Sequence, residues 1–266
     1  MRRFIIAGNW KMNKLSGDAK NIITELKPLV ADRKDVDILV CPPYTALCAA
    51  EEALKGSNIA LGAQDVFWKE SGAYTGQIAP SMLKDIGVSY VIVGHSETRG
   101  RYGVPEPSFT DTILKHFGES DATVNLKTKA ALAAGLIPII CVGETLSERK
   151  EGIQDGLIAD QVKAALAGVD AEAVPTLIFA YEPVWAIGTG ETCDSEEADR
   201  ICGLIRSTVG GLYGDNAAQS VRVQYGGSMK PSNAVELLSK PNIDGGLIGG
   251  AALKAADFAG IIAAAK

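Results

Sequence analysis

The segment Tyr90-Val91-Ile92-Val93-Gly94-His95-Ser96-Glu97 begins with four apolar residues and ends, after a glycine, with three polar ones. A short apolar run rich in β-branched residues is typical of a strand buried on both faces, as in a parallel sheet. The glycine marks the point where the strand ends. We therefore predict that His95 and its two polar neighbours lie at the carboxyl end of a buried strand.

Similar runs recur at Phe4–Ala7, Asp37–Cys41, Ile59–Ala63, Ile137–Val142, Thr176–Ala180, Val221–Gln224 and Gly246–Ile248. Segments with helical spacing lie between them, at Ser16–Ala31, Ser120–Ala134, Gly156–Leu166, Asp194–Val209, Ser232–Leu238 and Ala255–Ala265. Alternating strands and helices form either one barrel or one doubly wound sheet. The length of 266 residues fits two small domains or one barrel of about 250 residues. Because no low-complexity linker divides the chain, we predict a single domain spanning residues 1–266.

Polar residues and glycines gather at the carboxyl ends of the predicted strands, and the opposite ends carry no comparable cluster. The main groups are Asn9-Trp10-Lys11, His95-Ser96-Glu97, Glu182, Gly226-Gly227-Ser228 and Gly249-Gly250. In a parallel α/β barrel all these ends open on one face, where the βα loops build the active site. This asymmetry favours the α/β class with a single (β/α)8 barrel, and it predicts a functional site on that face.

Composition excludes several classes of protein. The chain has 26 basic and 32 acidic residues, a net charge of −6, which argues against nucleic acid or a membrane surface as a partner. No stretch approaches the roughly 18 apolar residues of a membrane span, and the first apolar run is too short for a signal peptide. Five cysteines without a Cys-x-x-Cys pair, and two histidines, predict free thiols, no metal and a cytoplasmic location.

Two glycine segments are candidate anion sites. Gly226-Gly227-Ser228 and Gly249-Gly250 each lead from a strand into a helix. Glycine lets backbone N–H groups approach a ligand, and the helix N-terminus adds partial positive charge. Either segment alone could serve only as a tight turn, but phosphate sites after strands seven and eight are frequent in such barrels. Lys11, which could also be an ordinary surface lysine, would add a positive charge.

His95 and Glu182 are the candidates for proton transfer. A base that removes a proton from carbon needs the partial desolvation that Glu182 has at the end of an apolar strand. His95 is expected near the start of a following helix, whose dipole would keep the imidazole neutral and able to donate to an enolate oxygen. Each residue alone is equally compatible with a structural role, as a packed histidine or a paired glutamate.

The segment Pro183–Gly190 is apolar, yet it has the proline and glycines of a loop. An apolar loop beside a site can act as a lid that excludes water while a backbone amide meets the ligand. An ordinary buried connection is the alternative.

Together these residues resemble the triosephosphate isomerase family over nearly the whole chain. The matching motifs are Asn9–Asn13, Gly94–Glu97, Ala180–Gly190, Tyr225–Ser228 and Gly249–Ala251. The resemblance implies interconversion of dihydroxyacetone phosphate and D-glyceraldehyde 3-phosphate through an enediol or enediolate, in glycolysis and gluconeogenesis, without a cofactor or metal. The roles of a glutamate base, a neutral histidine and a closing loop come with this family.

The resemblance also assigns roles to individual residues. It implies that Glu182 moves the proton between two carbons, that His95 serves the enediolate oxygens, and that Lys11 and Asn9 stabilise the developing charge. Backbone amides would bind the phosphate at Gly188, Ser228, Gly249 and Gly250. Ser96 and Glu97 would support these groups, with Glu97 ordering Lys11.

Three further features concern subunit contacts and departures from the family. Ser71–Gln77 resembles a loop that reaches into a neighbouring subunit, so we expect a homodimer with Thr75 near the neighbour's site. Thr98 and Gln77 stand where the family usually has arginine and glutamate. Roughly fifteen extra residues, at about 101–116, precede the motif Phe117–Asp121. This insertion could line the mouth of the site, extend the dimer contact, or do neither.

Two other readings compete with an active isomerase. The first is another phosphosugar enzyme on the same barrel, such as a lyase, against which the lid motif argues. The second is a catalytically silent binding protein, against which the intact set of Lys11, His95 and Glu182 argues.

Overall fold

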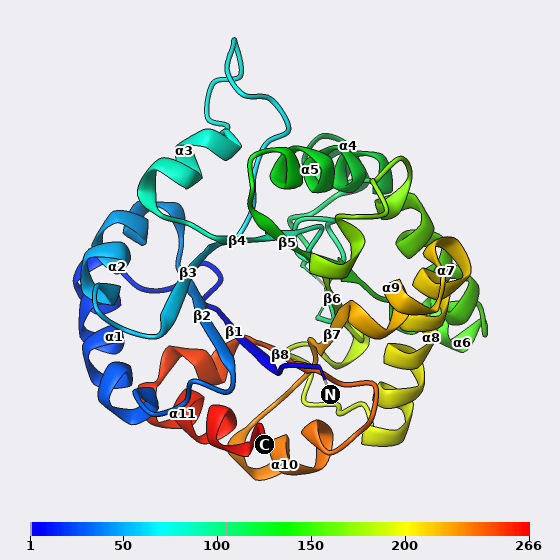
Figure 1. Ribbon diagram of the computed structural model, residues 1–266. Helices are drawn as coiled ribbons and strands as arrows, with labels where there is room; N and C mark the ends of the chain where they lie inside the picture. Colours follow the sequence, from blue (N-terminus) through cyan, green and yellow to red (C-terminus); the bar gives the residue numbers. More distant parts are fainter. Residues whose placement is uncertain (1, 105) are drawn as a thin grey trace.

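The computed structural model describes residues 2–104 and 106–266; Pro105, within the predicted insertion, and the side chain of His116 lie outside the described residues. The parallel strands pair in sequence order and form a closed barrel (Figure 1). Their bounds are β1 (Ile5–Asn9), β2 (Asp37–Cys41), β3 (Ile59–Ala63), β4 (Tyr90–Val93), β5 (Ile137–Val142), β6 (Ile178–Tyr181), β7 (Arg222–Tyr225) and β8 (Gly245–Ile248). The predicted (β/α)8 barrel is confirmed.

Helices surround the barrel and cover the outer face of the strands (Figure 1). They are α1 (Ser16–Val30), α2 (Leu47–Leu54), α3 (Pro80–Ile86), α4 (Asp111–Phe117), α5 (Asp121–Ala133), α6 (Leu146–Lys150), α7 (Gln154–Leu166), α8 (Ser195–Tyr213), α9 (Asp215–Ser220), α10 (Pro231–Leu238) and α11 (Ala255–Ala264). Short 3-10 turns follow at η1 (Tyr44–Ala46), η2 (Val174–Thr176), η3 (Val184–Ala186) and η4 (Gly250–Leu253). No helix in the described ranges is long and apolar enough to cross a membrane.

Most predicted bounds differ from the observed ones by a few residues. The predicted cap of α8 forms, because Asp194 Oδ1 accepts a hydrogen bond from the Glu197 N–H at 2.9 Å. The helices α2, α3, α6 and α9 were not predicted. They have five to eight residues, too few for a clear apolar period, and tertiary packing stabilises helices of this length.

Two apolar layers follow from the alternation of side chains along each strand. Residues such as Ile5 and Ala7 in β1 belong to a small cluster that fills the barrel. The intervening Ile6 belongs to the larger cluster between the strands and the surrounding helices. Because the strands are buried on both faces, their sequences are continuous apolar runs rather than alternations of apolar and polar residues.

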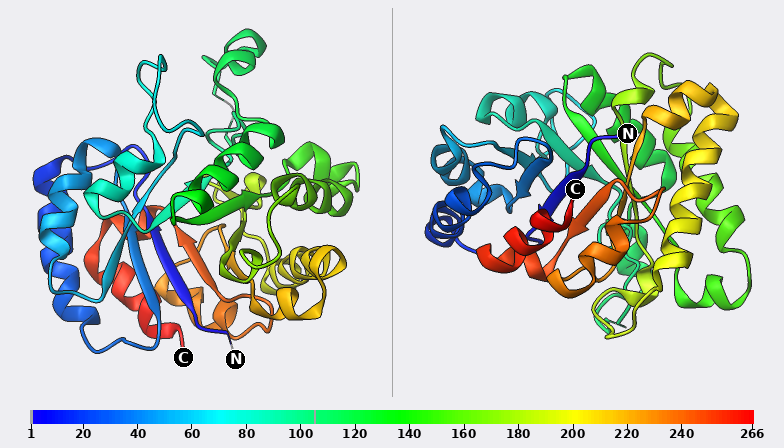
Figure 2. Two further views of the ribbon diagram at one scale, coloured as in Figure 1. Left: turned by 45° about the horizontal axis from the view of Figure 1, so that its top comes forward. Right: turned by 60° about the horizontal axis from the view of Figure 1, so that its bottom comes forward.

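Two segments extend beyond the carboxyl ends of the strands. Figure 2 (left) shows the chain between β3 and α3, in cyan, and the region of α4, in blue-green, both projecting away from the barrel. The first contains the predicted intersubunit loop, and the second contains the predicted insertion. Helix α4 begins at Asp111, three residues after the predicted start at Ser108.

A buried ion pair stabilises the opposite end of the barrel. Asp244, just before β8, accepts hydrogen bonds from the Val223 N–H at 2.8 Å and from Arg2 Nε at 2.6 Å. It also pairs with Arg206 of α8, and both members of this pair are buried. The cluster joins the N-terminus, α8 and two strands, so it helps to hold the barrel closed.

Replacing Asp244 with alanine is expected to lower the free energy of unfolding by about 3–5 kcal/mol, because Arg206 would keep a buried charge without its partner. Urea denaturation at fixed protein concentration measures this effect. The matched control is Asp155→Ala, which removes the exposed partner of Arg200 and should cost at most about 1 kcal/mol. Equal losses in the two variants would contradict the assigned role of the buried pair.

Candidate active site

The carboxyl ends of the strands surround a cavity of about 510 Å³. The predicted site residues that line it are Asn9, Lys11, His95, Ser96, Glu97, Gly188, Ser228, Gly249 and Gly250. Glu182 contacts this set through His95, and it lines a smaller neighbouring cavity. The structure therefore gathers side chains that lie up to 241 residues apart in the sequence.

Lys11 is held in an unusual backbone conformation. Its φ of 51° lies in the left-handed region, which residues other than glycine seldom adopt and which is often found at functional sites. Asn9 Oδ1 accepts a hydrogen bond from the Lys11 N–H at 3.0 Å, and Lys11 O accepts one from Gln64 Nε2 at 2.9 Å. Lys11 Nζ lies 2.7 Å from Glu97 Oε1. The ammonium is thus fixed at the cavity wall.

His95 is buried, with contacts at both ring nitrogens. The Glu97 N–H donates to Nδ1 at 3.2 Å, so Nδ1 is an acceptor and Nε2 carries the ring proton. Nε2 lies 2.8 Å from Glu182 Oε1. The prediction of a helix directly after His95 is wrong, because a hydrogen-bonded turn occupies this position. A backbone N–H in a turn, rather than a helix N-terminus, contacts the imidazole at Nδ1.

Glu182 is only 2% exposed at the end of β6. Its Oε2 accepts a hydrogen bond from the Ser96 N–H at 2.8 Å. Burial by itself would raise the pKa of Glu182, but the contacts with His95 and Ser96 and the positive charge of Lys11 outweigh it. The pKa is therefore held below its ordinary value, and the carboxylate is ionised near neutral pH.

The glycines after β7 and β8 differ in how much space a side chain would have at each position. A Cβ at Gly227 would collide with the ring and hydroxyl of Tyr225, so packing excludes other residues there. At Gly250 a Cβ would meet nothing within 4 Å, and at Gly249 it would lie 3.5 Å from Lys11 Cε. Gly249 and Gly250 therefore border open space beside the fixed ammonium, where an anion can approach backbone N–H groups.

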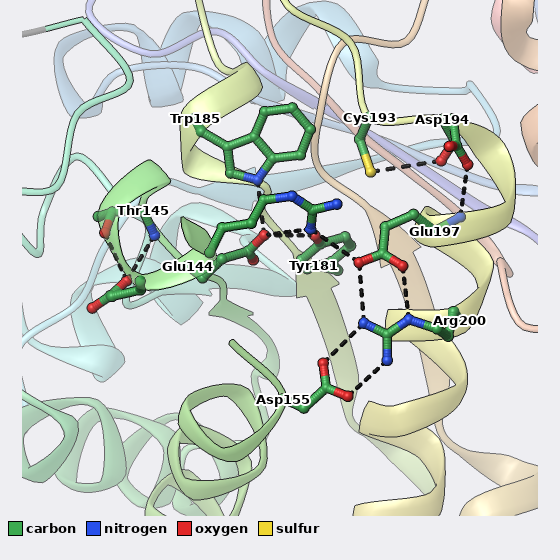
Figure 3. Close-up of polar contacts among 11 residues, drawn as sticks. Glu144, Thr145, Asp155, Tyr181, Trp185, Cys193, Asp194, Glu197 and Arg200 are labelled. Carbon is green, nitrogen blue, oxygen red and sulfur yellow. Dashed lines mark hydrogen bonds and ion pairs between the residues drawn. The ribbon is translucent and has the colours of Figure 1, made fainter. Parts of the chain in front are cut away.

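A buried carboxylate holds the predicted lid from one side. Glu144, after β5, accepts hydrogen bonds from Trp185 Nε1 at 2.8 Å and from Tyr181 Oη at 3.1 Å (Figure 3). Burial raises its pKa, opposed by these hydrogen bonds and by Arg149, whose guanidinium lies 4.8 Å from the Trp185 ring centroid. Sequence reasoning assigned Glu144 no role. An acid directly after a buried strand was the available signal.

Comparison with known proteins agrees with this geometry. The family model described as triosephosphate isomerase matches residues 4–265. The chain belongs to the triosephosphate isomerase family. Curated triosephosphate isomerases from Clostridium novyi and Moorella thermoacetica are 49% and 48% identical over 262 residues, covering 98% of this chain and of each relative. The crystal structure of triosephosphate isomerase from Bartonella henselae has a TM-score of 0.83 at 40% identity and covers 98% of both chains.

The predicted insertion after β4 borders the cavity. Arg101, Tyr102, Gly103 and Val104 line the cavity. The first residues of the insertion therefore line the mouth of the site, which was one of the three alternatives for this segment. Sequence reasoning missed these four residues because the family motifs contain no counterpart for them.

Thr98, one of the two predicted departures from the family, takes part in a polar cluster. Thr98 Oγ1 donates to Glu119 Oε2 at 2.6 Å. Glu119 also pairs with buried Lys127, whose Nζ lies 2.6 Å from Asp65 Oδ1. Lys127 supplies the positive charge next to Glu119.

Thr75 is exposed in the projecting chain between β3 and α3 and is not among the residues that line the cavity. Gln77, the other departure, is exposed there too. Within the described residues, no three His, Cys, Asp or Glu side chains group together as ligands for a metal ion.

The lowered pKa of Glu182 predicts a pH-dependent contribution to stability. Below the ordinary value of 4.5, an unfolded chain protonates this carboxyl while the folded protein still holds it charged. The free energy of unfolding of the wild type minus that of Glu182→Gln should therefore decrease as the pH drops below about 4.5, and it should stay constant above about 5.5. Urea denaturation across this range measures the difference. Glu172→Gln, at an exposed position, is the control. If the difference in free energy of unfolding between the wild type and Glu182→Gln increases on acidification, the assigned direction of the pKa shift is wrong.

Proposed function

We propose that this chain interconverts dihydroxyacetone phosphate and D-glyceraldehyde 3-phosphate, the reaction of its family, with Glu182, His95 and Lys11 as the catalytic residues. The observation that carries these roles is the contact of 2.8 Å between His95 Nε2 and Glu182 Oε1 beside a cavity that also contains Lys11. An ionised carboxylate, a neutral imidazole that donates and a fixed ammonium are the groups that proton transfer next to a carbonyl requires.

Glu182 acts as the base. Its carboxylate accepts a hydrogen bond from the Ser96 N–H and lies against His95, and it must turn from both toward the cavity to reach the substrate. It then removes a proton from the carbon next to the carbonyl and returns it to the neighbouring carbon. Burial removes water from the carboxylate, and the strand anchors its backbone, so the base is positioned and poorly solvated.

His95 and Lys11 stabilise the oxygens that gain negative charge. The Nε2–H released by Glu182 can donate to the carbonyl oxygen, which becomes an enediolate oxygen. Because the Glu97 N–H fixes the tautomer before substrate binds, this donor needs no reorganisation during the reaction. Asn9 contributes by holding the backbone of Lys11 in its left-handed conformation.

The phosphate is bound mainly by backbone amides. Gly188, Ser228, Gly249 and Gly250 border the same cavity as Lys11. Their N–H groups and the ammonium provide local positive potential within a chain whose net charge is −6. The segment Pro183–Gly190 closes over the bound substrate as a lid and excludes water, which would otherwise compete for the charged intermediate.

Replacing Glu182 with glutamine tests the assignment, because it removes the base while keeping the shape of the side chain. A coupled assay should show conversion of the two triose phosphates by the wild type and a loss of roughly 10²–10⁴ in kcat for Glu182→Gln. Glu172→Gln should match the wild type. An inactive, folded wild type would favour the catalytically silent alternative, and near-normal turnover of Glu182→Gln would refute the base.

The proposal extends to assembly, domain organisation and location. We propose a homodimer in which Thr75 lies near the partner's site, and a single domain of residues 1–266 that carries the insertion at about 101–116. Pairing of β1 with β8 joins both ends of the chain in one sheet and supports the single domain. The free cysteines support a cytoplasmic location, where thiols stay reduced.

Exposed apolar residues between β1 and α1 give the dimer a test. Met12 is 95% exposed and Leu15 78% exposed, which favours a covering partner. Sedimentation equilibrium should give about twice the chain mass of 27.9 kDa for the wild type, and Met12→Asp should shift it toward 27.9 kDa. Val235→Asp, at an exposed position in α10, is the control. A monomeric wild type at micromolar concentration would contradict the homodimer.

A further inference from the structure

The insertion after β4 contacts the predicted lid directly. Arg101–Val104 line the cavity together with Ile187 and Gly188 of the lid. The lid is therefore bordered on one side by the end of β5, through the Glu144 and Trp185 contact (Figure 3), and on another by the insertion. The insertion is thus placed to influence where the lid rests.

The first residues of the insertion are anchored to the segment that carries His95. The Arg101 N–H donates to Ser96 O at 2.8 Å, and Tyr102 Oη donates to Glu97 O at 3.1 Å. The Arg101 guanidinium pairs with Glu148 of α6. Glu148 Oε2 accepts a hydrogen bond from the Thr145 N–H at 2.7 Å, which fixes the carboxylate. A segment with anchors on two elements presents a firm surface to the lid.

Gly103 is the point of closest approach. A Cβ at this position would lie 2.5 Å from Ile187 O and 3.0 Å from Thr189 Cγ2, and closer still to Val184 O. Two of these atoms are backbone carbonyl oxygens, which cannot turn aside as the end of a flexible side chain can. The φ of Gly103 is outside the left-handed region, so alanine fits the backbone conformation and only space requires glycine.

We propose that Gly103 is a positioning residue for the lid: its lack of a side chain lets the insertion pack against the Val184, Ile187 and Thr189 segment and so set the lid's resting position. This inference rests on the proposed function, because it assigns the lid a role in binding triose phosphates. A methyl group at position 103 must displace either the lid or the insertion. The two anchors of the insertion favour displacement of the lid, which carries the phosphate-binding amide of Gly188.

The test uses a steric series at one position, Gly103→Ala and Gly103→Val, in the full-length protein. Gly156→Ala is the matched control, because a Cβ there meets nothing within 4 Å. The probe is sn-glycerol 3-phosphate, a substrate-sized phosphate ester that cannot isomerise. Its Kd is measured by calorimetry, with kcat and KM for both triose phosphates. Lid position is followed by fluorine NMR of 5-fluorotryptophan-labelled protein, with the Trp185 resonance assigned through Trp185→Phe.

We expect Gly103→Ala to shift the Trp185 resonance in the free protein. We also expect it to weaken binding of sn-glycerol 3-phosphate by on the order of ten-fold, with KM raised in proportion and a larger effect in Gly103→Val. Gly156→Ala should match the wild type in all measurements. A lower Tm in Gly103→Ala with the Trp185 resonance and Kd unchanged would show that the insertion gives way, and would overturn the proposal.

Failure of the proposed function is distinguishable from failure of this inference. A wild type that does not isomerise the triose phosphates contradicts the function. The Trp185 resonance of the unliganded variants would still report whether Gly103 positions the segment. If Gly103→Val does not fold, Gly103→Ala alone decides the outcome.

Discussion

Hydrogen bonding between β1 and β8 closes the sheet, and the active site depends on that closure. Ile5 through Gly8 pair in register with Gly245 through Ile248, so the first and last strands become neighbours. Closure places Lys11, which follows β1, beside Gly249, which follows β8. In an open sheet these residues would lie at opposite edges. The parallel direction of every strand then puts the remaining loops, with His95 and Glu182, on the same face.

The architecture and most of the site could be predicted from the sequence because they depend on local patterns. Strands buried on both faces appear as short apolar runs, and the residue that follows each run must lie at the carboxyl rim. Asn9, Lys11 and His95 were located by this argument alone, before any resemblance was considered. Their roles required the family motifs, since an isolated strand-end histidine or lysine has several structural explanations.

Contacts between distant segments could not be predicted in the same way. A helix was expected after His95, but a turn occupies this position, and its Glu97 N–H donates to the Nδ1 atom of His95. The Glu144 contacts with Tyr181 and Trp185 span about 40 residues of sequence, and their hydrogen bonds leave no periodic signal. The cavity wall from Arg101 to Val104 belongs to an insertion for which the family motifs provide no template.

Two separate physical causes require glycine at particular positions of this chain, which has 29 glycines in 266 residues. At Gly188 the φ of 73° requires glycine by conformation, although a Cβ would meet nothing within 4 Å. At Gly227 and Gly103 the φ is outside the left-handed region, and neighbouring atoms occupy the space of a Cβ. Substitution at the first kind of position strains the backbone of the residue itself, whereas substitution at the second displaces a neighbour. Since the neighbour of Gly103 is the lid, a substitution at Gly103, which lies outside the catalytic set, can change substrate binding.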